Sequence, residues 1–468
     1  MVLPLLLASA VAASPAPSPT GALDDRITAA VLRTVDFRAV PGAAVGVSRD
    51  GKLIYVKGFG KRNIAANQPV NAQTAFEIGS MTKQFTAAEI LQLQAAHKLA
   101  IDDKLSKYLP SFPHANDVTL RNLLNQTSGM PDYVTDQLLL SPVVSTEPTH
   151  AELMARIKGP LHFIPGTKWE YSNSNYLALG WVVERVSGVS WEDYTRTHLF
   201  AVAHMAHSGF FSDEAKMRNV ATGYNRGVDD KSALKVSPPI ANGWAGGAGA
   251  IVSTIADINA WNDALQNGRI VSFSDYKLMT TPPDLPNKPA LPYGMGLARD
   301  LVDGHVRIWH NGGTGGSHTM NACFPDDHVC VIVFENTAGG APENVSTAVF
   351  EAVVPEAAAA AAQAVPGEDS AITARARSLY DQLMHNAIDD TKLTDPMRER
   401  FTPELRRQIA ATFTQYGEPT AVIFKGKQQN GGLTTYLYRF EFASGAFTMS
   451  LTIDDASDLI AGVHLLPS

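Results

Sequence analysis

Two stretches of strand-like sequence, one near each end of a largely helical segment, constrain the fold of this chain most. The first is "GAAVGVSRDGKLIYVKGFG", 42–60, which reads as two strands around a turn at Asp50-Gly51. Strand-like alternation returns at 306–309 and 329–334, after a middle that reads mostly as helices and loops punctuated by Gly and Pro. Because β elements open and close this segment, we predict an α+β fold with one antiparallel sheet made from both ends and a helical region beside it.

The only two cysteines, Cys323 and Cys330, lie on either side of a predicted hairpin turn at Asp326-Asp327. Counting outwards from this turn pairs Phe324 with Val329 and Cys323 with Cys330. Directly opposed residues of a hairpin come close enough for a disulfide. Two buried free thiols are the alternative, and a metal site would need more ligands than this stretch offers.

The N-terminal sequence "MVLPLLLASAVAASPAPSP" resembles a secretory signal peptide over 1–13, because an apolar run precedes small residues at candidate cleavage sites. The run is shorter than the roughly 20 residues that span a bilayer, so we expect no transmembrane anchor. No Lys or Arg precedes it, which leaves an apolar leader without an export role as the alternative. On the first interpretation the protein is secreted or periplasmic, and 14–24 is a Pro/Ser-rich linker.

A change in composition divides the rest of the chain. The segment "VPEAAAAAAQAVPGEDSA" has prolines on both sides of its alanine run and no large apolar residues, which favours a linker over 355–370. It would join a main domain, 25–354, to a tail, 371–468. The tail reads as two helices and four strands, and the aromatic residues of its second strand, 433–442, alternate onto one face, as core residues do. We predict a small α+β accessory domain, loosely similar in element order to the nuclear-transport-factor-2-like cone fold.

The stretch "FEIGSMTKQF", 76–85, places Ser80 and Lys83 three residues apart at the start of a helix predicted to end near residue 98. Residues three apart share a helix face, so the Lys83 amine can reach the Ser80 hydroxyl and, if desolvated, act as its base. The spacing alone decides nothing, because 232–235 and 274–277 also fit Ser-x-x-Lys. Only Ser80 follows a strand-like region and opens a strongly apolar helix. The alternative is an N-cap serine beside a solvated lysine.

Two polar groups downstream could serve the same chemistry. Tyr171-Ser172-Asn173, the only Tyr-x-Asn of the chain, precedes an apolar helical run. A tyrosine can relay a proton, and an asparagine can hold a substrate carbonyl or fix a lysine; a helix-capping loop is the alternative. "HNGGTGGS", which begins at His310, ends an apolar β run, and its glycines could leave an N–H free as an oxyanion donor. His207-Ser208-Gly209 also fits His-x-Gly, so that triplet is weak alone.

Six stretches, in order, carry a resemblance to a known family: "PGAAVGVSRDGKLIYVKGFGKRN", "FEIGSMTKQFTA", "NLLNQTSGMPDY", "PGTKWEYSNSNYLALGWVVERVSG", "GWAGGAGAIVSTIADINAW" and "HNGGTGGS". Over 25–354 the chain resembles the serine β-lactamase and penicillin-binding-protein-like hydrolases, especially the class C-type branch with D-aminopeptidases and family VIII esterases. The resemblance implies the β-lactamase/DD-peptidase fold, an antiparallel sheet flanked by helices plus a helical subdomain. The tail lies outside it.

The resemblance also implies a mechanism. Ser80 would attack a carbonyl and form an acyl-enzyme, while Lys83 and Tyr171 would share the proton transfers. The N–H groups of Ser80 and Gly313 would form the oxyanion hole. Water would then release the acyl group, and no metal or organic cofactor is implied.

The same resemblance assigns the substrate contacts. Asn173 would orient the substrate amide, and His310, followed by Gly312, would occupy the position of the third-motif cation. β-Lactamases and DD-peptidases commonly have Lys-Thr-Gly in this motif, whereas a histidine is mostly neutral at pH 7. The usual His before Thr-Ser-Gly is Gln126 in this chain.

We therefore expect a serine hydrolase that acts on small esters or D-residue-containing peptides. A β-lactamase or D-alanyl-D-alanine carboxypeptidase is the alternative among enzymes, and a non-catalytic, penicillin-recognising sensor is the alternative of another class. The expected partner is a small-molecule or short-peptide substrate. The formal net charge of −8 argues against nucleic acid, because phosphate binding needs a basic surface. The oligomeric state stays open.

Overall fold

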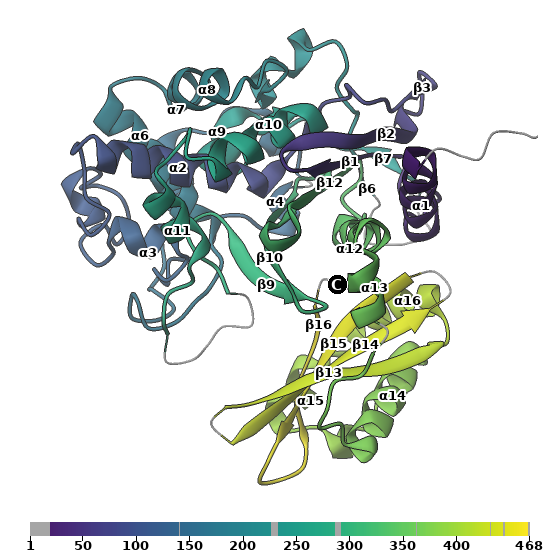
Figure 1. The fold of residues 1–468 in the computed structure, drawn as a ribbon. Helices are drawn as coiled ribbons and strands as arrows, with labels where there is room; N and C mark the ends of the chain where they lie inside the picture. The colour runs from purple at the N-terminus through teal and green to yellow at the C-terminus, as the bar shows by residue number, and fades with distance from the viewer. Residues whose placement is uncertain are drawn as a thin grey trace, which may run out of the picture.

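A seven-stranded antiparallel sheet is the largest element of the computed structural model, which describes residues 19–139, 141–225, 233–285, 292–361, 363–430, 432–442 and 445–466. The sheet lies among helices in the upper part of Figure 1. Its strand order is β3-β2-β1-β12-β11-β10-β9. The strands are β1 Gly42–Arg49, β2 Lys52–Asn63, β3 Gln68–Pro69, β9 Ala298–Val302, β10 His305–Gly313, β11 His318–Phe324 and β12 Val329–Glu335.

Strands from the two ends of the main segment lie side by side at the centre of this sheet. β1 pairs antiparallel with β12, so that Ala43 faces Glu335 and Arg49 faces Val329. The prediction of a single antiparallel sheet made from both ends is therefore confirmed, as is the α+β fold class. In the β11–β12 hairpin Cys323 faces Cys330, and the two sulfurs form a disulfide, the first of the two alternatives.

Both faces of the sheet are covered, which explains why its central strands read as nearly continuous apolar runs. Val45 and Val333 point into a buried cluster with helices α1, Pro19–Thr34, and α12, Pro342–Val353. The neighbouring Ala44 and Phe334 point to the opposite face, into the cluster that contains α2, Lys83–Ala95, and α10, Ile255–Gln266. α2 and α10 therefore lie on the face away from α1 and α12.

The middle of the chain forms the expected helical region beside the sheet (Figure 1). Inside this region, helix α6 packs against helices α2 and α3. The helices of this region are α3 Leu120–Leu124, α4 Asp136–Leu139, α5 His150–Ile157, α6 Asn173–Ser187, α7 Trp191–Thr195, α8 Ala201–Ala203, α9 Asn242–Ala245 and α11 Phe273–Thr280. Two small sheets accompany them, formed by β4 Phe76–Glu77, β8 Ile251–Ser253 and β5 Gly209–Phe210, and by β6 Tyr224–Asn225 and β7 Lys235–Val236.

The tail folds as a separate small α+β domain, shown in light green and yellow in Figure 1. As predicted, helices precede a four-stranded sheet of order β13-β14-β15-β16. Tyr438 and Phe440 of β14 are fully buried, in agreement with the predicted core face. The elements are α14 Ser370–Met384, α15 Asp395–Arg400, α16 Pro403–Tyr416, β13 Ala421–Asn430, β14 Leu433–Phe442, β15 Gly445–Asp454 and β16 Ile460–Leu466. The short helix α15 was not expected.

The two predicted linkers need correction. Helix α1 begins at Pro19, inside the range 14–24, and buries Ile27 and Val31 against the main domain. Helix α13, Pro355–Ala361, occupies the first part of 355–370, and its Ala357 is fully buried. Small alanines can pack closely against a neighbouring surface, so the absence of large apolar residues did not prevent a packed helix. The expected signal peptide, 1–13, lies outside the described residues.

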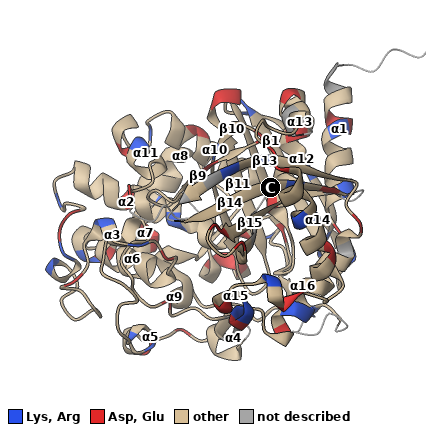
Figure 2. Ribbon diagram, turned by 90° about the horizontal axis from the view of Figure 1, so that it is seen from below, with Lys and Arg blue, Asp and Glu red and all other residues tan. Residues whose placement is uncertain are grey.

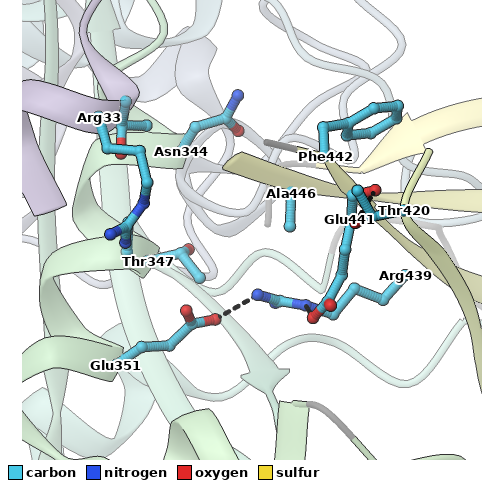
Figure 3. A pocket seen from close by; sticks show the side chains of 11 residues that line it. Arg33, Asn344, Thr347, Glu351, Thr420, Arg439, Glu441, Phe442 and Ala446 are labelled. Carbon is cyan, nitrogen blue, oxygen red and sulfur yellow. Dashed lines mark hydrogen bonds and ion pairs between the residues drawn. The ribbon is translucent and has the colours of Figure 1, made fainter. Parts of the chain in front are cut away.

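The two domains meet where α12 and the β9–β10 turn face the small sheet. Arg439 of β14 contacts Glu351 of α12 at 2.6 Å and Asp303 of the turn at 3.5 Å. Beside this contact lies a cavity of about 180 Å³, lined also by Arg33 and Thr347 and seen in Figure 3 between α12 and the small sheet. Figure 2 shows Lys and Arg interspersed with Asp and Glu along the helices of both domains. Within the described residues no helix is long and apolar enough to cross a membrane.

Candidate active site

Ser80 lies in a short 3-10 turn, Gly79–Thr82, that joins β4 to α2. Gly79 has a φ of +52°, and a Cβ on it would lie 2.8 Å from the backbone nitrogen of Gly313 at the end of β10. Both its conformation and this close approach require glycine. The turn thus sets the partly buried Ser80 beside the last residues of β10. The observed helix, α2, runs from Lys83 to Ala95 and is slightly shorter than the predicted one.

The Lys83 side chain is fully buried, and its Nζ donates to Ser80 Oγ at 2.9 Å, Asn173 Oδ1 at 2.8 Å and the Ala248 carbonyl oxygen at 2.8 Å. Burial lowers the pKa of Lys83 to about 7, although the charge of Asp132 acts in the opposite direction. A substantial fraction of Lys83 is therefore uncharged at neutral pH. The alternative of a solvated first-turn lysine is wrong.

Asp132, which the sequence did not single out, fixes the orientation of Asn173. Its carboxylate accepts the Asn173 backbone N–H at 3.1 Å and the Nδ2 group at 2.9 Å. Because Nδ2 is turned to this carboxylate, Oδ1 of Asn173 faces Lys83. Of the two roles that the sequence allowed for Asn173, this geometry matches fixing the lysine. Asp132 lies within the family-like stretch "NLLNQTSGMPDY", which was the only sequence signal for it.

Tyr171 approaches both Ser80 and Lys83. Its hydroxyl hydrogen-bonds to Ser80, and Lys83 Nζ lies 4.9 Å from the centre of its ring. Burial raises the pKa of Tyr171, and the negative charge of Asp132 adds to the effect, against the hydrogen bond from Ser80. The phenol therefore stays protonated at neutral pH. It can relay a proton, whereas Lys83 can exist as a neutral base.

His310 lies on β10 with only 3% of its surface exposed. Its Nδ1 lies 2.5 Å from the Asn311 carbonyl oxygen, and its Nε2 lies 3.0 Å from the hydroxyl of Tyr293, a residue that the sequence did not single out. Burial, with the charge of Lys83, lowers the pKa of His310 to about 3. The ring is therefore neutral at pH 7. His310 occupies the expected place on the strand but does not supply the cation that the family motif commonly holds there.

The two glycines after Asn311 have different surroundings. Thr314 N donates to Ser317 O at 2.9 Å, so Gly313 and His318 form the next, non-hydrogen-bonded pair of the β10–β11 ladder. The Gly313 N–H thus points away from β11, towards the turn that holds Ser80. A Cβ on Gly312 would lie 1.9 Å from the Ile78 carbonyl oxygen, whereas Gly313 has open space.

The tip of the β10–β11 hairpin is anchored to the chain that precedes Ser80. Thr314 Oγ1 donates to Glu77 Oε2 at 2.5 Å, and Ser317 Oγ donates to the Glu77 carbonyl oxygen at 2.9 Å. A Cβ on Gly316 would lie 2.7 Å from Gly223 Cα. The glycines of "HNGGTGGS" therefore serve close packing of backbones as well as access to the site.

Gln126, which replaces the usual family histidine, supports the loop that carries Tyr171. Its Oε1 accepts the backbone N–H of Ser172 at 3.0 Å and the Nδ2 group of Asn175 at 2.5 Å. Glutamine thus positions this loop without taking part in the lysine and serine contacts.

The other motif matches lack this setting. Ser274 and Lys277 are both exposed at the start of α11, and Ser232 lies outside the described residues. His207 is largely exposed. Only Ser80 combines a serine hydroxyl with a fully buried lysine among the matches that can be compared. In the part of the chain that the structure describes, no group of three or more His, Cys, Asp or Glu side chains could hold a metal ion.

Comparisons with known proteins identify the family of this chain. The family model described as Beta-lactamase matches residues 28–355. A Bacillus subtilis (strain 168) chain named as a penicillin-binding protein, PbpX, is 30% identical over 63% of this chain and 70% of its own length. A D-aminopeptidase of Brucella canis is 29% identical over 70% of this chain, which spans 62% of that relative's length.

A solved structure has a similar fold. A D-stereospecific amidohydrolase from Streptomyces sp. superposes with a TM-score of 0.61 at 25% identity, over 72% of this chain and 98% of that one. The family match covers the sheet, the helical region and every predicted site residue. The chain belongs to the beta-lactamase family and is a serine hydrolase of that family.

Proposed function

We propose that this chain hydrolyses short D-residue-containing peptides, small amides or small esters through an acyl-enzyme on Ser80. One observation carries the proposal: the buried Lys83 amine contacts the Ser80 hydroxyl and two amide oxygens, of Asn173 and Ala248. Amide oxygens only accept hydrogen bonds, so the two N–H bonds of a neutral Lys83 go to them. Its lone pair is then directed at Ser80.

Acylation follows from these contacts. As Ser80 Oγ forms a bond to the substrate carbonyl carbon, Lys83 takes the hydroxyl proton. The N–H groups of Ser80 and Gly313 donate to the developing oxyanion. The bond from carbon to the leaving nitrogen or oxygen then breaks, and Tyr171 relays the proton from Lys83 to the leaving group. Water attacks the acyl-enzyme by the reverse proton transfers and frees Ser80.

The names of the relatives support the substrate class. The D-aminopeptidase and the D-stereospecific amidohydrolase act, by their names, on D-configured substrates. Because one relative is named as a penicillin-binding protein, a β-lactamase or D-alanyl-D-alanine carboxypeptidase activity is the second candidate for this chain. A non-catalytic sensor is the third candidate. It would form the acyl-enzyme without hydrolysing it, so turnover of a substrate separates it from the first two.

Acylation of Ser80 is tested by intact mass after incubation with a fluorophosphonate or a fluorescent penicillin. We expect one adduct on the wild type, none on Ser80→Ala, and an unchanged adduct on Ser274→Ala, the exposed serine of another Ser-x-x-Lys. Absence of any adduct with both reagents would contradict the proposal. Hydrolysis of three substrates then separates the candidates: D-alanine p-nitroanilide, L-alanine p-nitroanilide and the β-lactam nitrocefin. A D-selective amidase hydrolyses only D-alanine p-nitroanilide.

Export and domain division belong to the same proposal. We propose that 1–13 is removed as a signal peptide, which N-terminal sequencing of the secreted or periplasmic protein would test. A mature chain that retains Met1 would contradict it. Residues 25–354 would carry the hydrolase activity and 371–468 would be an accessory domain.

A further inference from the structure

The hydrogen bonds of His310 determine where its proton lies. Nδ1 is 2.5 Å from the Asn311 carbonyl oxygen, which can only accept, so Nδ1 carries the hydrogen. In a neutral ring Nε2 is then an acceptor, and the Tyr293 hydroxyl at 3.0 Å donates to it. Tyr293 is itself 1% exposed, so water does not compete for its hydroxyl proton. The other acceptor within its reach is the hydroxyl of Tyr176, whose own proton goes to the Leu124 carbonyl oxygen at 2.6 Å.

The surroundings of His310 also disfavour a positive charge. The rings of Tyr293 and Tyr171 lie 5.6 Å and 6.4 Å from the imidazole, centre to centre. The ionisable groups that face this cluster are Tyr171 from the loop before α6, Tyr176 from α6, and Lys83 from α2, whose charge repels a protonated imidazole. Neither ring nitrogen of His310 therefore offers an N–H or a positive charge to a substrate.

We propose that Tyr293 is a specificity-determining residue: by donating to Nε2 it holds His310 as the neutral Nδ1–H tautomer, so that the site favours substrates that are uncharged beyond the scissile bond over those that end there in a carboxylate. This inference rests on the proposed acylation of Ser80. A carboxylate beside His310 would lose water without gaining a cation or a ring N–H, and such burial is unfavourable. An amide or ester at the same place avoids that cost.

A pair of peptides with the same scissile bond tests the specificity. D-Alanyl-D-alanine amide and D-alanyl-D-alanine differ only in the charge beyond that bond. We expect the wild type to have a kcat/KM at least about tenfold higher for the amide, since the carboxylate loses charged hydrogen bonds. Tyr293→Phe leaves Nε2 without its donor. The neutral ring can then carry its hydrogen on Nε2 and donate it to a carboxylate, so we expect the preference to fall about tenfold, mainly through a lower KM for the free acid. Equal preference in wild type and variant would overturn the proposal.

Tyr380→Phe is the matched control. Tyr380 is a fully buried tyrosine of the small domain whose hydroxyl donates to the Gly417 carbonyl oxygen at 2.7 Å. Loss of that hydroxyl removes a comparable hydrogen bond outside the site, so we expect the ratio of the two kcat/KM values to stay within about twofold of the wild type. A change in this control as large as that in Tyr293→Phe would show a general loss of stability, and would overturn the proposal.

The tautomer is measured directly by nitrogen NMR of histidine-labelled protein, with His310→Gln to assign the signal. We expect the Nδ1–H form between pH 5 and 9 in the wild type, and protonation at a higher pH in Tyr293→Phe. An Nε2–H tautomer, or a wild-type ring that protonates near pH 6.5, would overturn the inference. This readout needs no turnover, so it decides the role of Tyr293 even if neither peptide is hydrolysed and the proposed function fails.

Discussion

At the scale of single residues, the site depends on how one lysine charge is balanced. Lys83 is fully buried, which favours its neutral form, while Asp132 favours its protonated form. Asn173 lies between the two groups. Its Nδ2 donates to the Asp132 carboxylate at 2.9 Å, and its Oδ1 accepts a hydrogen bond from Lys83. A general base works best when its pKa lies near the working pH. Asp132 thus keeps the pKa of a buried lysine from falling too far.

The variant Asp132→Asn tests this balance. Without the negative charge the pKa of Lys83 falls below about 7, so Lys83 stays neutral at a lower pH. We expect the acid limb of the kcat/KM–pH profile to move to lower pH. At pH 8 we expect a fall in kcat/KM of roughly tenfold or more, because an asparagine cannot accept both Asn173 hydrogen bonds equally well. An acid limb at unchanged pH would contradict this account of Lys83.

At the scale of elements, the end of β10 is pressed against the turn that holds Ser80. Gly312→Ala would place a Cβ 1.9 Å from the Ile78 carbonyl oxygen, so strand and turn must move apart. Because a shift of about 1 Å at reacting groups can lower a rate about 100-fold, we expect a loss of that order in kcat/KM. The control Gly339→Ala lies away from the site, and its Cβ would meet no atom closer than Thr337 Oγ1 at 4.0 Å, so we expect activity within about twofold of wild type. Similar activities for both variants would contradict this packing.

The buried carboxyl groups of Glu77 and Glu214 connect β4, the β10–β11 hairpin and the segment after β5. Glu77 of β4 accepts from Thr314 of the hairpin, and Glu214, in the segment after β5, hydrogen-bonds to Glu77. Burial raises the pKa of Glu214 to about 8, with the charge of Glu77 adding to the effect. The pair therefore retains a proton in the folded protein at pH values where the unfolded chain has lost it.

The sign of the pH effect follows. The pKa of Glu214 is higher in the folded than in the unfolded state. Its contribution to the free energy of unfolding is therefore fully present below about pH 4.5 and is lost as the pH rises towards 8. Glu214→Gln removes this titration, so we expect its melting temperature to fall less than that of the wild type between pH 5 and 8. The difference should be roughly 2–4 °C for each kcal/mol of stability involved. As a control, Glu399→Gln at an exposed position should show the same dependence of melting temperature on pH as the wild type. The same dependence in Glu214→Gln would contradict the interpretation.

At the scale of the whole molecule, a buried arginine is among the residues that join the two domains. Arg439 is 6% exposed and contacts Glu351 and Asp303 of the main domain. Without Arg439, Asp303 keeps Lys425 at 3.6 Å, but the carboxylate of Glu351 loses this partner. Breaking a buried ion pair costs about 3–5 kcal/mol. We therefore expect Arg439→Met to lower the melting temperature by several degrees in calorimetry, whereas Arg407→Met, at an exposed ion pair, should leave it nearly unchanged. Equal effects of the two variants would contradict a stabilising domain contact.

The extent of what sequence could predict differs along the site. Ser80 and Lys83 are three residues apart, so helix geometry alone brings them together. Asp132 and Asn173 are 41 residues apart, and no local pattern marks their contact. Tyr293 reaches His310 only because the chain before β9 returns to β10. Linker boundaries failed for a similar reason, since burial of α1 depends on α12, which is far away in the chain.

The sequence by itself determined the α+β class, the central sheet made from both ends, the hairpin that pairs Cys323 with Cys330, and the serine–lysine pair. These follow from periodicity and short spacings, which act between near neighbours along the chain. Only the tertiary structure decided the charge states of the site: a neutral His310 under Tyr293, a lysine with a pKa near 7, and an asparagine oriented by Asp132. The physical reason is that desolvation and buried hydrogen bonds depend on which distant segments enclose a group, and no local pattern records that.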